Sequence, residues 1–498
     1  MQIQFNKSAI QCLETLLQEV QNAEVTQEVR LPEGMPDIGR ILTTWGQVLI
    51  RSKEWHGSEV MLTGGVKTWT LYAPEDGTEP RSVESWLPFQ LVWKVDMVDR
   101  EGPVRMIPLL RFADSRSISS RKMIVRTGVT ALAQALHPKM AEIYQSGDLP
   151  EDIEILKKTY PLRVPVESGE KTFLIDEEFA LPESTESVEK LLGMMVWPEI
   201  TEKRTISDKI VFKGNLAMHL VCRNQEGRIR SFDLSHPFSQ LSELDKSYGP
   251  EEQADIQMAV TSLDADLGEG GKVRVKCGLT AQYLLDDCLL LELVEDAYSP
   301  YREVSTVEDL LQLPVVGDEL SELMQAEVTV PGQEGISADA VFLPDFPRMR
   351  RGPDGQSLEL PGMFQSLVYG EHDALQGFSA RWEGNKQFGS DGNGDWMTTV
   401  QPEGSVRTVL TSEGLNLSAP LHVRMMPSWR QNIPMVVALE VGAIQEQDPT
   451  RPSVIICGCE GRSLWELAKE NGSTVSAIRS ANPVATDGSE GLLLIPVL

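Results

Sequence analysis

The stretch Met61–Gln90 (MLTGGVKTWTLYAPEDGTEPRSVESWLPFQ) decides the fold of this chain, because the chain contains it twice. The second copy is Ile210–Gln240 (IVFKGNLAMHLVCRNQEGRIRSFDLSHPFSQ). Each copy has an alternating run, a turn that contains glycine, and a second run that closes on Pro-Phe. Aligning Gly65 with Gly214 gives an offset of 149 residues (214 − 65). Such an internal repeat indicates a structural unit that the chain uses more than once.

Alternation with a period of two predicts a strand with one buried face, because successive side chains of a strand point to opposite sides. In the second copy, the apolar side chains that share one face are Ile210, Phe212, Leu216, Met218, Leu220 and Cys222. The other face carries Lys213, Asn215 and His219, which we expect to be solvated. The pattern is typical of a half-buried strand that leads into a hairpin.

Further blocks repeat at nearly the same offset. Lys122–Ala131 matches Lys272–Ala281 (272 − 122 = 150), and Leu31-Pro32-Glu33 matches Leu181-Pro182-Glu183 (181 − 31 = 150). The Lys122–Ala131 pair alternates between an apolar face and a charged face, as antiparallel sheets do. The chain is therefore predicted to be mainly β, with tandem antiparallel, sandwich-like modules of about 150 residues.

A third, degraded copy is expected after the second. Leu313-Pro314 repeats the spacing of the earlier Leu-Pro blocks, and Met363–Gln365 echoes the closing Phe-Gln of the first copy. Pro344 and Pro347 interrupt the strand of this copy, since proline removes a ladder hydrogen bond. A Gly-rich insertion follows it.

The N-terminal segment Lys7–Val20 is predicted to be a helix with Ser8 as its N-cap, because four aliphatic residues fall on one helical stripe. The predicted division of the chain is an N-terminal helix (1–24), module 1 (25–165), module 2 (166–300), a degenerate third module with the Gly-rich insertion (301–447) and a C-terminal domain (448–498).

Charge, hydrophobic runs and cysteine distribution argue against several classes of function. The formal net charge of −29 over 498 residues argues against nucleic-acid binding, which needs a basic surface. No run is long and apolar enough to span a bilayer, and the first residues lack a signal-peptide pattern. Cys12, Cys222, Cys277 and Cys288 are scattered, as expected of reduced core thiols. We expect a cytoplasmic protein without membrane insertion.

The last fifty residues predict a small α+β domain with the order βααβ. Ser453–Cys457 suits a strand, and Ser463 with Glu466 three residues later forms a capping box for a helix. A second helix stops before Asn482-Pro483, and Leu492–Pro496 suits a closing strand. Such a domain has a very small core.

This domain resembles the LysM family. The box Gly461–Trp465 matches the family's Gly-Asp-Thr-Leu-Trp, and Leu467-Ala468, Asn482 and Leu493–Pro496 match its later blocks. The resemblance implies a groove for N-acetylglucosamine chains, or a partner surface, formed by Gly461, Arg462, Ser463, Leu464, Asn482, Pro483 and Val484. It assigns structural roles to Trp465, Ile495 and Pro496. Arg462 stands where the family has Asp, which leaves protein binding open as the alternative to glycan binding.

The repeats, in turn, resemble the SPOCS domain of bacterial endospore coat proteins. The resemblance rests on Leu31–Ile38, Gly46–Val48, Gly65 and Tyr72. SPOCS modules followed by one LysM domain imply a non-enzymatic scaffold of spore coat assembly at the forespore surface in the mother cell. The partner that the resemblance implies is a coat ATPase like SpoIVA. The alternative is a cell-wall protein that binds peptidoglycan through its LysM domain.

No catalytic or metal site is predicted, and no cofactor. The histidines have no metal-ligand spacing, and no nucleophile elbow or phosphate loop occurs. Asp286, Asp287 and Glu292 are expected to be solvated acids, and the tryptophans near the first repeat, Trp45, Trp69, Trp86 and Trp93, to be core residues or a sugar platform. Asp391–Asp395 starts like a calcium loop, but Trp396 and Pro402 break the pattern, so we expect a hairpin tip. Cys457 and Cys459 are interpreted as core or turn thiols.

Overall fold

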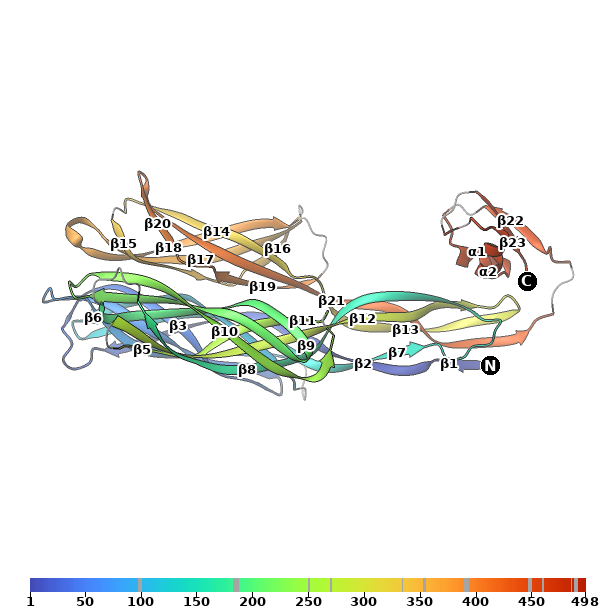
Figure 1. Cartoon of the computed structure of the whole chain (residues 1–498), viewed down its shortest axis with the longest axis horizontal. Coiled ribbons are helices and arrows are strands. Elements are labelled where there is room, and N and C mark those ends of the chain that lie inside the picture. Colours follow the sequence, from blue (N-terminus) through green and yellow to red (C-terminus); the bar gives the residue numbers. More distant parts are fainter. Residues whose placement is uncertain are drawn as a thin grey trace.

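The computed structural model contains three β-sheet modules packed side by side and a small C-terminal domain at one end (Figure 1). It describes residues 1–96, 101–181, 188–249, 251–268, 271–333, 335–352, 355–388, 394–446, 450–458, 461–484, 486–487 and 491–498. Strands make up most of it, which confirms the prediction of a mainly β chain. None of the helices in these ranges is long and apolar enough to cross a membrane.

The three modules follow one another along the chain. Module 1 contains β2 (Asn6–Arg30), β3 (Ile38–His56), β4 (Glu59–Pro74), β5 (Arg81–Lys94), β6 (Val104–Ser119) and β7 (Lys122–Gln145). Module 2 contains β8 (Glu154–Ala180), β9 (Val188–Asn224), β10 (Ile229–Tyr248), β11 (Gln253–Leu267) and β12 (Lys272–Tyr298). Module 3 contains β13 (Arg302–Val316), β14 (Leu320–Pro331), β15 (Ile336–Pro344), β16 (Arg348–Gly352), β17 (Gly355–Tyr369), β18 (Leu375–Phe388), β19 (Asp395–Pro402), β20 (Arg407–Thr411) and β21 (Gly414–Ile444). The short β1 (Gln2–Gln4) pairs with β21.

One sheet has the same strand order in each module. The last strand of the module is the central one, and it pairs with the first strand on one side and with the strand that precedes it in the sequence on the other. The orders are β2-β7-β6 and β8-β12-β11, and in module 3 β21 pairs with β13 and β14 on one side and with β19 and β20 on the other. The second sheet is β3-β4-β5 in module 1, β9-β10 in module 2 and β15-β17-β18 with β16 in module 3. An apolar cluster between the two sheets forms the core of module 1.

Modules 1 and 2 also share their strand register. Arg30 pairs with Lys122 and Ala180 pairs with Lys272, so both partners are shifted by 150 (180 − 30; 272 − 122). A β-bulge between Leu110 and Phe112 recurs 150 residues later, between Val260 and Ser262. The two modules therefore have one topology, as the sequence repeat predicts.

The register corrects one alignment within the repeat. Gly64 pairs with Phe89, and Gly214 pairs with Phe238, so Gly214 corresponds to Gly64 and not to Gly65. A Cβ at either glycine would lie within 3 Å of the ring of the paired phenylalanine, at 2.9 Å for Gly64 and 2.5 Å for Gly214. Glycine is needed here because the ring of the neighbouring strand lies across the backbone.

The predicted N-terminal helix is wrong, because Lys7–Val20 belongs to strand β2, which pairs with β7. A β-bulge between Thr15 and Leu17 changes which face successive residues occupy, so Cys12 and Leu17 are both buried although they lie an odd number of residues apart. This spacing imitates a helical stripe. The predicted boundary at residue 165 falls inside strand β8, whose partner β12 lies more than 100 residues away.

The motif matches proposed for the third module are also wrong, although its topology follows the other two. Leu313-Pro314 lies inside β13, and the counterpart of the strand end at Leu31 is the end of β14 at Pro331, which pairs with Gly414. Met363–Gln365 lies in the central strand β17, where module 1 has β4. The predicted interruption at Pro344 and Pro347 is present: it separates β15 from β16, and both pair with β17.

The modules share a core at one end of the molecule. The starts of β2, β8 and β13 and the ends of β7, β12 and β21 extend together as a stalk, on the right in Figure 1. The buried residues of this stalk are Cys12, Ala141, Ile143, Val164, Leu291, Leu293, Leu311, Leu313, Val315, Ile433 and Met435. Since all three modules contribute to this cluster, they form one body around a common axis.

One turn offers a test of the repeat by exchange of residues. Ser207 in β9 has a positive φ of 53°, and its counterpart in module 1 is Gly57 with a φ of 58°. A non-glycine residue with a positive φ destabilises the fold by roughly 1–2 kcal/mol. Glycine avoids this strain, but its greater freedom in the unfolded chain offsets part of the gain in stability. Ser207→Gly is therefore expected to stabilise the protein by about 0.5 kcal/mol in urea unfolding. Gly57→Ser is the matched reverse change and is expected to destabilise it; a stabilising Gly57→Ser would contradict the prediction.

Candidate functional site

The C-terminal domain carries the residues that the sequence analysis selects as a binding site. It consists of β22 (Val454–Gly458), α1 (Leu464–Asn471), α2 (Val475–Ala481) and β23 (Leu492–Pro496). Ser463 is the N-cap of α1: its side chain accepts a hydrogen bond from the Glu466 N–H, and the Glu466 carboxylate accepts one from the Ser463 N–H. Gly472 ends α1 with a φ of 60°. These local signals place α1 where the sequence predicts a helix.

The domain is docked on the end of the stalk. The Trp465 ring lies 4.7 Å from the Tyr298 ring in an edge-on arrangement, and its indole N–H donates to Asp296 Oδ2 at 2.8 Å. Lys469 Nζ donates to both carboxylate oxygens of Asp296, at 2.7 and 2.8 Å. The Tyr298 hydroxyl donates to the Ser473 carbonyl at 3.0 Å. Trp465 therefore belongs both to the small core and to the contact with module 2.

The first predicted segment, Gly461–Leu464, divides between surface and core. Gly461 is exposed and Arg462 forms an ion pair with Glu470 at the surface. The Leu464 side chain, on the first residue of α1, is buried with 1 % exposure and packs in the small core of the domain, so only its backbone could border the predicted groove. Its N–H donates to Asp487 Oδ1 at 2.8 Å. This bond joins the box to the loop after α2.

The second predicted segment, Asn482–Val484, lies at the edge of β23. The Asn482 side chain donates to the Leu494 carbonyl (2.6 Å) and accepts from the Leu494 N–H (2.9 Å), which closes this edge of the sheet. The Val484 side chain is 92 % exposed. Asp487, which holds the two segments together, was missed by the sequence analysis. Its position in the turn signal Thr486-Asp487-Gly488 could have indicated it.

The two faces of the β22–β23 sheet differ in their surroundings. Ile455, Cys457, Leu493 and Ile495 face the helices, and the predicted structural residue Ile495 is fully buried. Pro496 ends β23 and is half-buried. The opposite face carries four aliphatic side chains that are 44–76 % exposed, and they are Val454, Ile456, Leu492 and Leu494. Apolar side chains in such a cluster mark a contact surface more often than isolated exposed ones do.

The described residues contain no group of three or more His, Cys, Asp or Glu side chains that could hold a metal ion. Residues 391–393 of the proposed calcium loop and Cys459 lie outside the described ranges, and Asp395 begins strand β19. Cys457 is half-buried, Cys12, Cys222 and Cys277 are buried, and Cys288 is exposed, so the expectation of a core thiol is wrong for Cys288.

The tryptophans of module 1 do not form a sugar platform. Trp45 and Trp93 are buried, with 1 % and 0 % exposure. Trp69 and Trp86 are half-buried and pack against the apolar core of module 2. Trp45, Trp69 and Trp86 pack between modules, and Trp93 packs in the core of module 1, so core packing accounts for all four rings.

Buried charges hold the three modules together on their common axis. Arg105 of module 1 and Asp255 of module 2 occupy equivalent positions (255 − 105 = 150) and form an ion pair that is almost fully buried. Arg424 of module 3 donates to Asp255 Oδ1 at 3.2 Å and to both carboxylate oxygens of Glu319 at 2.8 Å. Despite burial, the Arg105 and Arg424 charges lower the pKa of Asp255 to about 2.

Asp286 lies beside this cluster, and the expectation that it is a solvated acid is wrong. Its side chain is 3 % exposed, and one of its carboxylate oxygens has no hydrogen-bond partner. Burial, and then the negative charge of Asp255, raise the pKa of Asp286 to about 7. No local pattern indicates this, because Asp255 and Asp286 come together only through the pairing of β11 with β12.

A second buried charge cluster involves His219, which was expected on a solvated face and is 4 % exposed instead. Its Nδ1 lies 2.7 Å from Asp233 Oδ1, and its Nε2 lies 2.6 Å from Asp339 Oδ1. Asp339 also accepts a hydrogen bond from the Trp45 indole at 2.7 Å, so the three modules meet here again. Burial alone disfavours the imidazolium, but the Asp339 charge and the hydrogen bonds to Asp233 and Asp339 outweigh it and raise the pKa of His219 to about 10.

The raised pKa of His219 predicts a pH dependence of stability. Because the folded state holds this proton more tightly, the stabilisation is complete below pH 6.5 and is lost as the pH rises from 6.5 to about 10. The slope that one group can contribute is at most about 1.4 kcal/mol per pH unit. We expect the free energy of unfolding of the wild type to fall more steeply over this range than that of His219→Gln. Parallel curves for the two proteins would contradict the prediction.

Comparison with known proteins gives no relative: no family model matches the chain, and neither the curated proteins nor the solved structures contain a match.

Proposed function

We propose that this protein is a non-enzymatic scaffold of endospore coat assembly whose C-terminal domain binds a coat ATPase like SpoIVA. The proposal extends the resemblance to the SPOCS and LysM families, a domain order like that of SipL. The observation that carries it is the placement of the C-terminal domain. One side of the domain is fixed on the stalk by Trp465, Asp296 and Tyr298. The loops at Arg462 and Val484 and the outer face of the β22–β23 sheet are exposed.

The chemistry of this exposed surface favours a protein over a glycan as its partner. Trp465 is the only aromatic residue between residues 450 and 498, and it is buried, so the domain has no ring available for stacking on a sugar. Exposed aliphatic side chains such as Leu492 and Val484 suit the apolar centre of a protein interface. The shared core of the stalk gives the modules a rigid mount for such a domain.

The proposal predicts the behaviour of Arg462→Asp. Since Arg462 is partly exposed and pairs with Glu470 at the surface, the substitution should leave the fold intact. If the partner presents an acidic surface to this loop, its affinity should fall about two- to fivefold, the range of an exposed charge pair. The measurement is titration of the full chain with a purified SpoIVA-like ATPase, at low and at moderate salt. Equal affinity of Arg462→Asp and the wild type would exclude Arg462 from the interface.

A second pair of variants tests the apolar face. Leu492→Lys changes a side chain that is 76 % exposed on the outer sheet face, and Leu290→Lys changes one that is 75 % exposed on β12 and serves as the control. Loss of ATPase binding in the first variant alone would support the proposal. Saturable binding of the wild type to peptidoglycan, competed by N-acetylglucosamine oligomers, would support the cell-wall alternative instead. Binding to neither probe would overturn both functions.

A further inference from the structure

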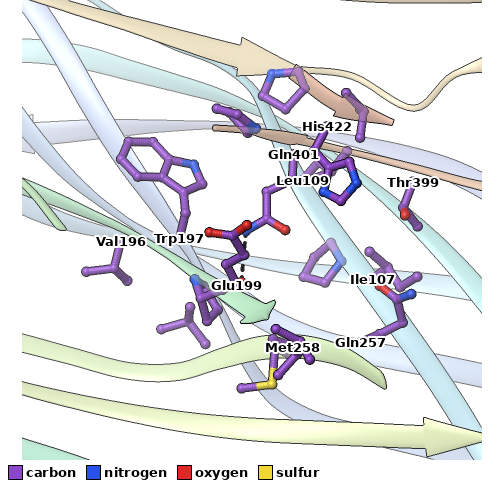
Figure 2. Close-up of a pocket in the computed structure, with 18 of the residues that line it drawn as sticks. Ile107, Leu109, Val196, Trp197, Glu199, Gln257, Met258, Thr399, Gln401 and His422 are labelled. Carbon is purple, nitrogen blue, oxygen red and sulfur yellow. Dashed lines mark hydrogen bonds between the residues drawn. The ribbon is translucent and has the colours of Figure 1, made fainter. Parts of the chain in front are cut away.

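A cleft of about 330 Å³ opens where the three modules meet, and it is independent of the C-terminal domain. Its walls come from β3 and β6 of module 1, β9 and β11 of module 2, and β15, β19 and β21 of module 3. Figure 2 shows Trp197 and Glu199 of β9 around the same opening as Gln401 of β19 and His422 of β21. Its size lies within the range of small-molecule sites, which occur preferentially where domains meet.

Glu199 departs from the pattern of the repeat. Its counterpart in module 1 is Leu49 (199 − 49 = 150), and the two face equivalent glycines. A Cβ at Gly64 would lie 2.4 Å from the Leu49 carbonyl oxygen, and one at Gly214 would lie 2.0 Å from that of Glu199. Leu49 is 3 % exposed and packs in the apolar core of module 2. Because the fold accepts an aliphatic side chain at this position, the carboxylate of Glu199 is not required for folding.

Trp197 shows the same departure. Its counterpart is Gln47 (197 − 47 = 150), whose side chain carbonyl accepts a hydrogen bond from the Val196 N–H at 2.9 Å and so joins modules 1 and 2. Trp197 makes an edge-on contact with the His219 ring at 6.5 Å and also lines the cleft. Module 2 therefore places an indole and a carboxylate in the cleft. At the equivalent positions of module 1, the Gln47 amide borders the same cleft and bonds to module 2, and Leu49 is buried in the core of module 2.

The charges in the cleft leave one carboxylate available. Arg424 and Lys203 both pair with Glu319, at 2.8 and 3.3 Å. Glu202 pairs at 3.0 Å with a lysine outside the cleft. Within the described part of the chain, Glu199 has neither an ion pair nor a hydrogen bond through its side chain. The lining thus has three carboxylates against Lys203 and Arg424, together with one histidine, and the surrounding chain has a net charge of −29, which attracts cations.

The remaining wall combines aliphatic side chains with polar ones, among them Gln257, Thr399 and Gln401. Leu109 and Met258 contribute apolar surface from modules 1 and 2. The Gln401 amide N–H donates to the Pro198 carbonyl at 2.9 Å, which fixes the orientation of this side chain in the cleft. A carboxylate, an indole and an apolar wall are the groups that recognise an organic cation with an apolar body.

We propose that this cleft binds a small amphiphilic amine, with the ammonium group at the Glu199 carboxylate and the apolar body between Trp197, Leu109 and Met258. The ammonium group forms a charge-assisted hydrogen bond to the carboxylate, which is stronger than one between neutral groups. The partly enclosed walls strengthen this attraction relative to that in water. A neutral molecule of the same shape gains only the apolar contact.

The test compares two ligands of the same shape by calorimetry on the full chain at pH 7. The probes are phenethylammonium chloride and 2-phenylethanol. We expect the amine to bind at least about tenfold more tightly than the alcohol. Glu199→Gln is expected to weaken amine binding about tenfold, which corresponds to about 1.4 kcal/mol, and to leave alcohol binding unchanged. As a folding control, the midpoint temperature of thermal unfolding should be the same for Glu199→Gln and the wild type.

Glu202→Gln is the matched control, because Glu202 lines the same cleft but is already paired with Lys213. It should change amine affinity by less than about twofold. An equal loss in both variants would assign the effect to the general negative field and overturn the proposed contact. The proposal also fails if the amine does not bind at millimolar concentration, or if amine and alcohol bind equally. Binding of the SpoIVA-like ATPase is measured separately, so neither result decides the other.

Discussion

Asp255→Ala is expected to destabilise the protein by roughly 3–5 kcal/mol, as removal of one partner from a buried ion pair does. The side chains of Asp255 and Arg105 are 1 % and 2 % exposed, so water cannot replace the lost carboxylate. Arg424 of module 3 loses the same partner, although it keeps Glu319. The loss therefore acts on contacts among all three modules. Urea unfolding followed by far-UV circular dichroism measures it.

The matched control is Asp176→Ala. Asp176 pairs with Arg274 at 2.8 Å, and both side chains are largely solvated, so its removal should cost less than about 1 kcal/mol. A cost for Asp255→Ala that is no larger than that of Asp176→Ala would show that the axis cluster does not hold the modules together.

Trp465→Ala is expected to unfold the C-terminal domain, because truncating a buried tryptophan costs roughly 3–5 kcal/mol and the core of this domain is small. The substitution also removes contacts between the domain and the stalk. Without the indole, the edge-on contact with Tyr298 and the hydrogen bond to Asp296 disappear, so the domain also leaves the stalk. Hydrogen exchange should show unprotected amides in α1 and α2, with unchanged protection in the three modules.

Tyr298→Phe separates docking from folding. It keeps the ring beside Trp465 and removes only the hydroxyl that donates to the Ser473 carbonyl, so it should cost about 1 kcal/mol and leave α1 protected. Protected amides in α1 of Trp465→Ala would contradict the first expectation. Loss of α1 protection in Tyr298→Phe would show that the domain cannot fold without the stalk.

Particular residues show which features of the fold sequence patterns can predict. The buried face of Ile210–Cys222 and the capping box at Ser463 and Glu466 were predicted correctly. Both depend on residues that lie two to four positions apart. The helix predicted for Lys7–Val20 failed, because the same spacing of apolar residues arises from a strand with a bulge. No property of that segment alone distinguishes the two structures, since the partner strand β7 decides between them.

In the candidate site, too, local signals predicted some residue positions correctly and not others. Arg462 and Val484 are at the surface, where local loop signals place them, whereas the Leu464 side chain of α1 is buried in the core of the domain. The cleft with Trp197 and Glu199 was not predicted, because its walls come from strands of three modules. The sequence signals were the departures of Trp197 from Gln47 and of Glu199 from Leu49, and they could be recognised only with the offset of 150.

By itself, the sequence determined the local features of this protein: the alternating strands, the repeated unit and the caps of α1. These follow from short-range rules of backbone geometry and side-chain spacing. Only the tertiary structure decided that first and last strands pair, that Arg105, Asp255 and Arg424 meet on one axis, and that Trp465 docks on Asp296. The physical reason is that a charged side chain has the same sequence signal in water and in a buried pair, and only its distant partners determine which applies.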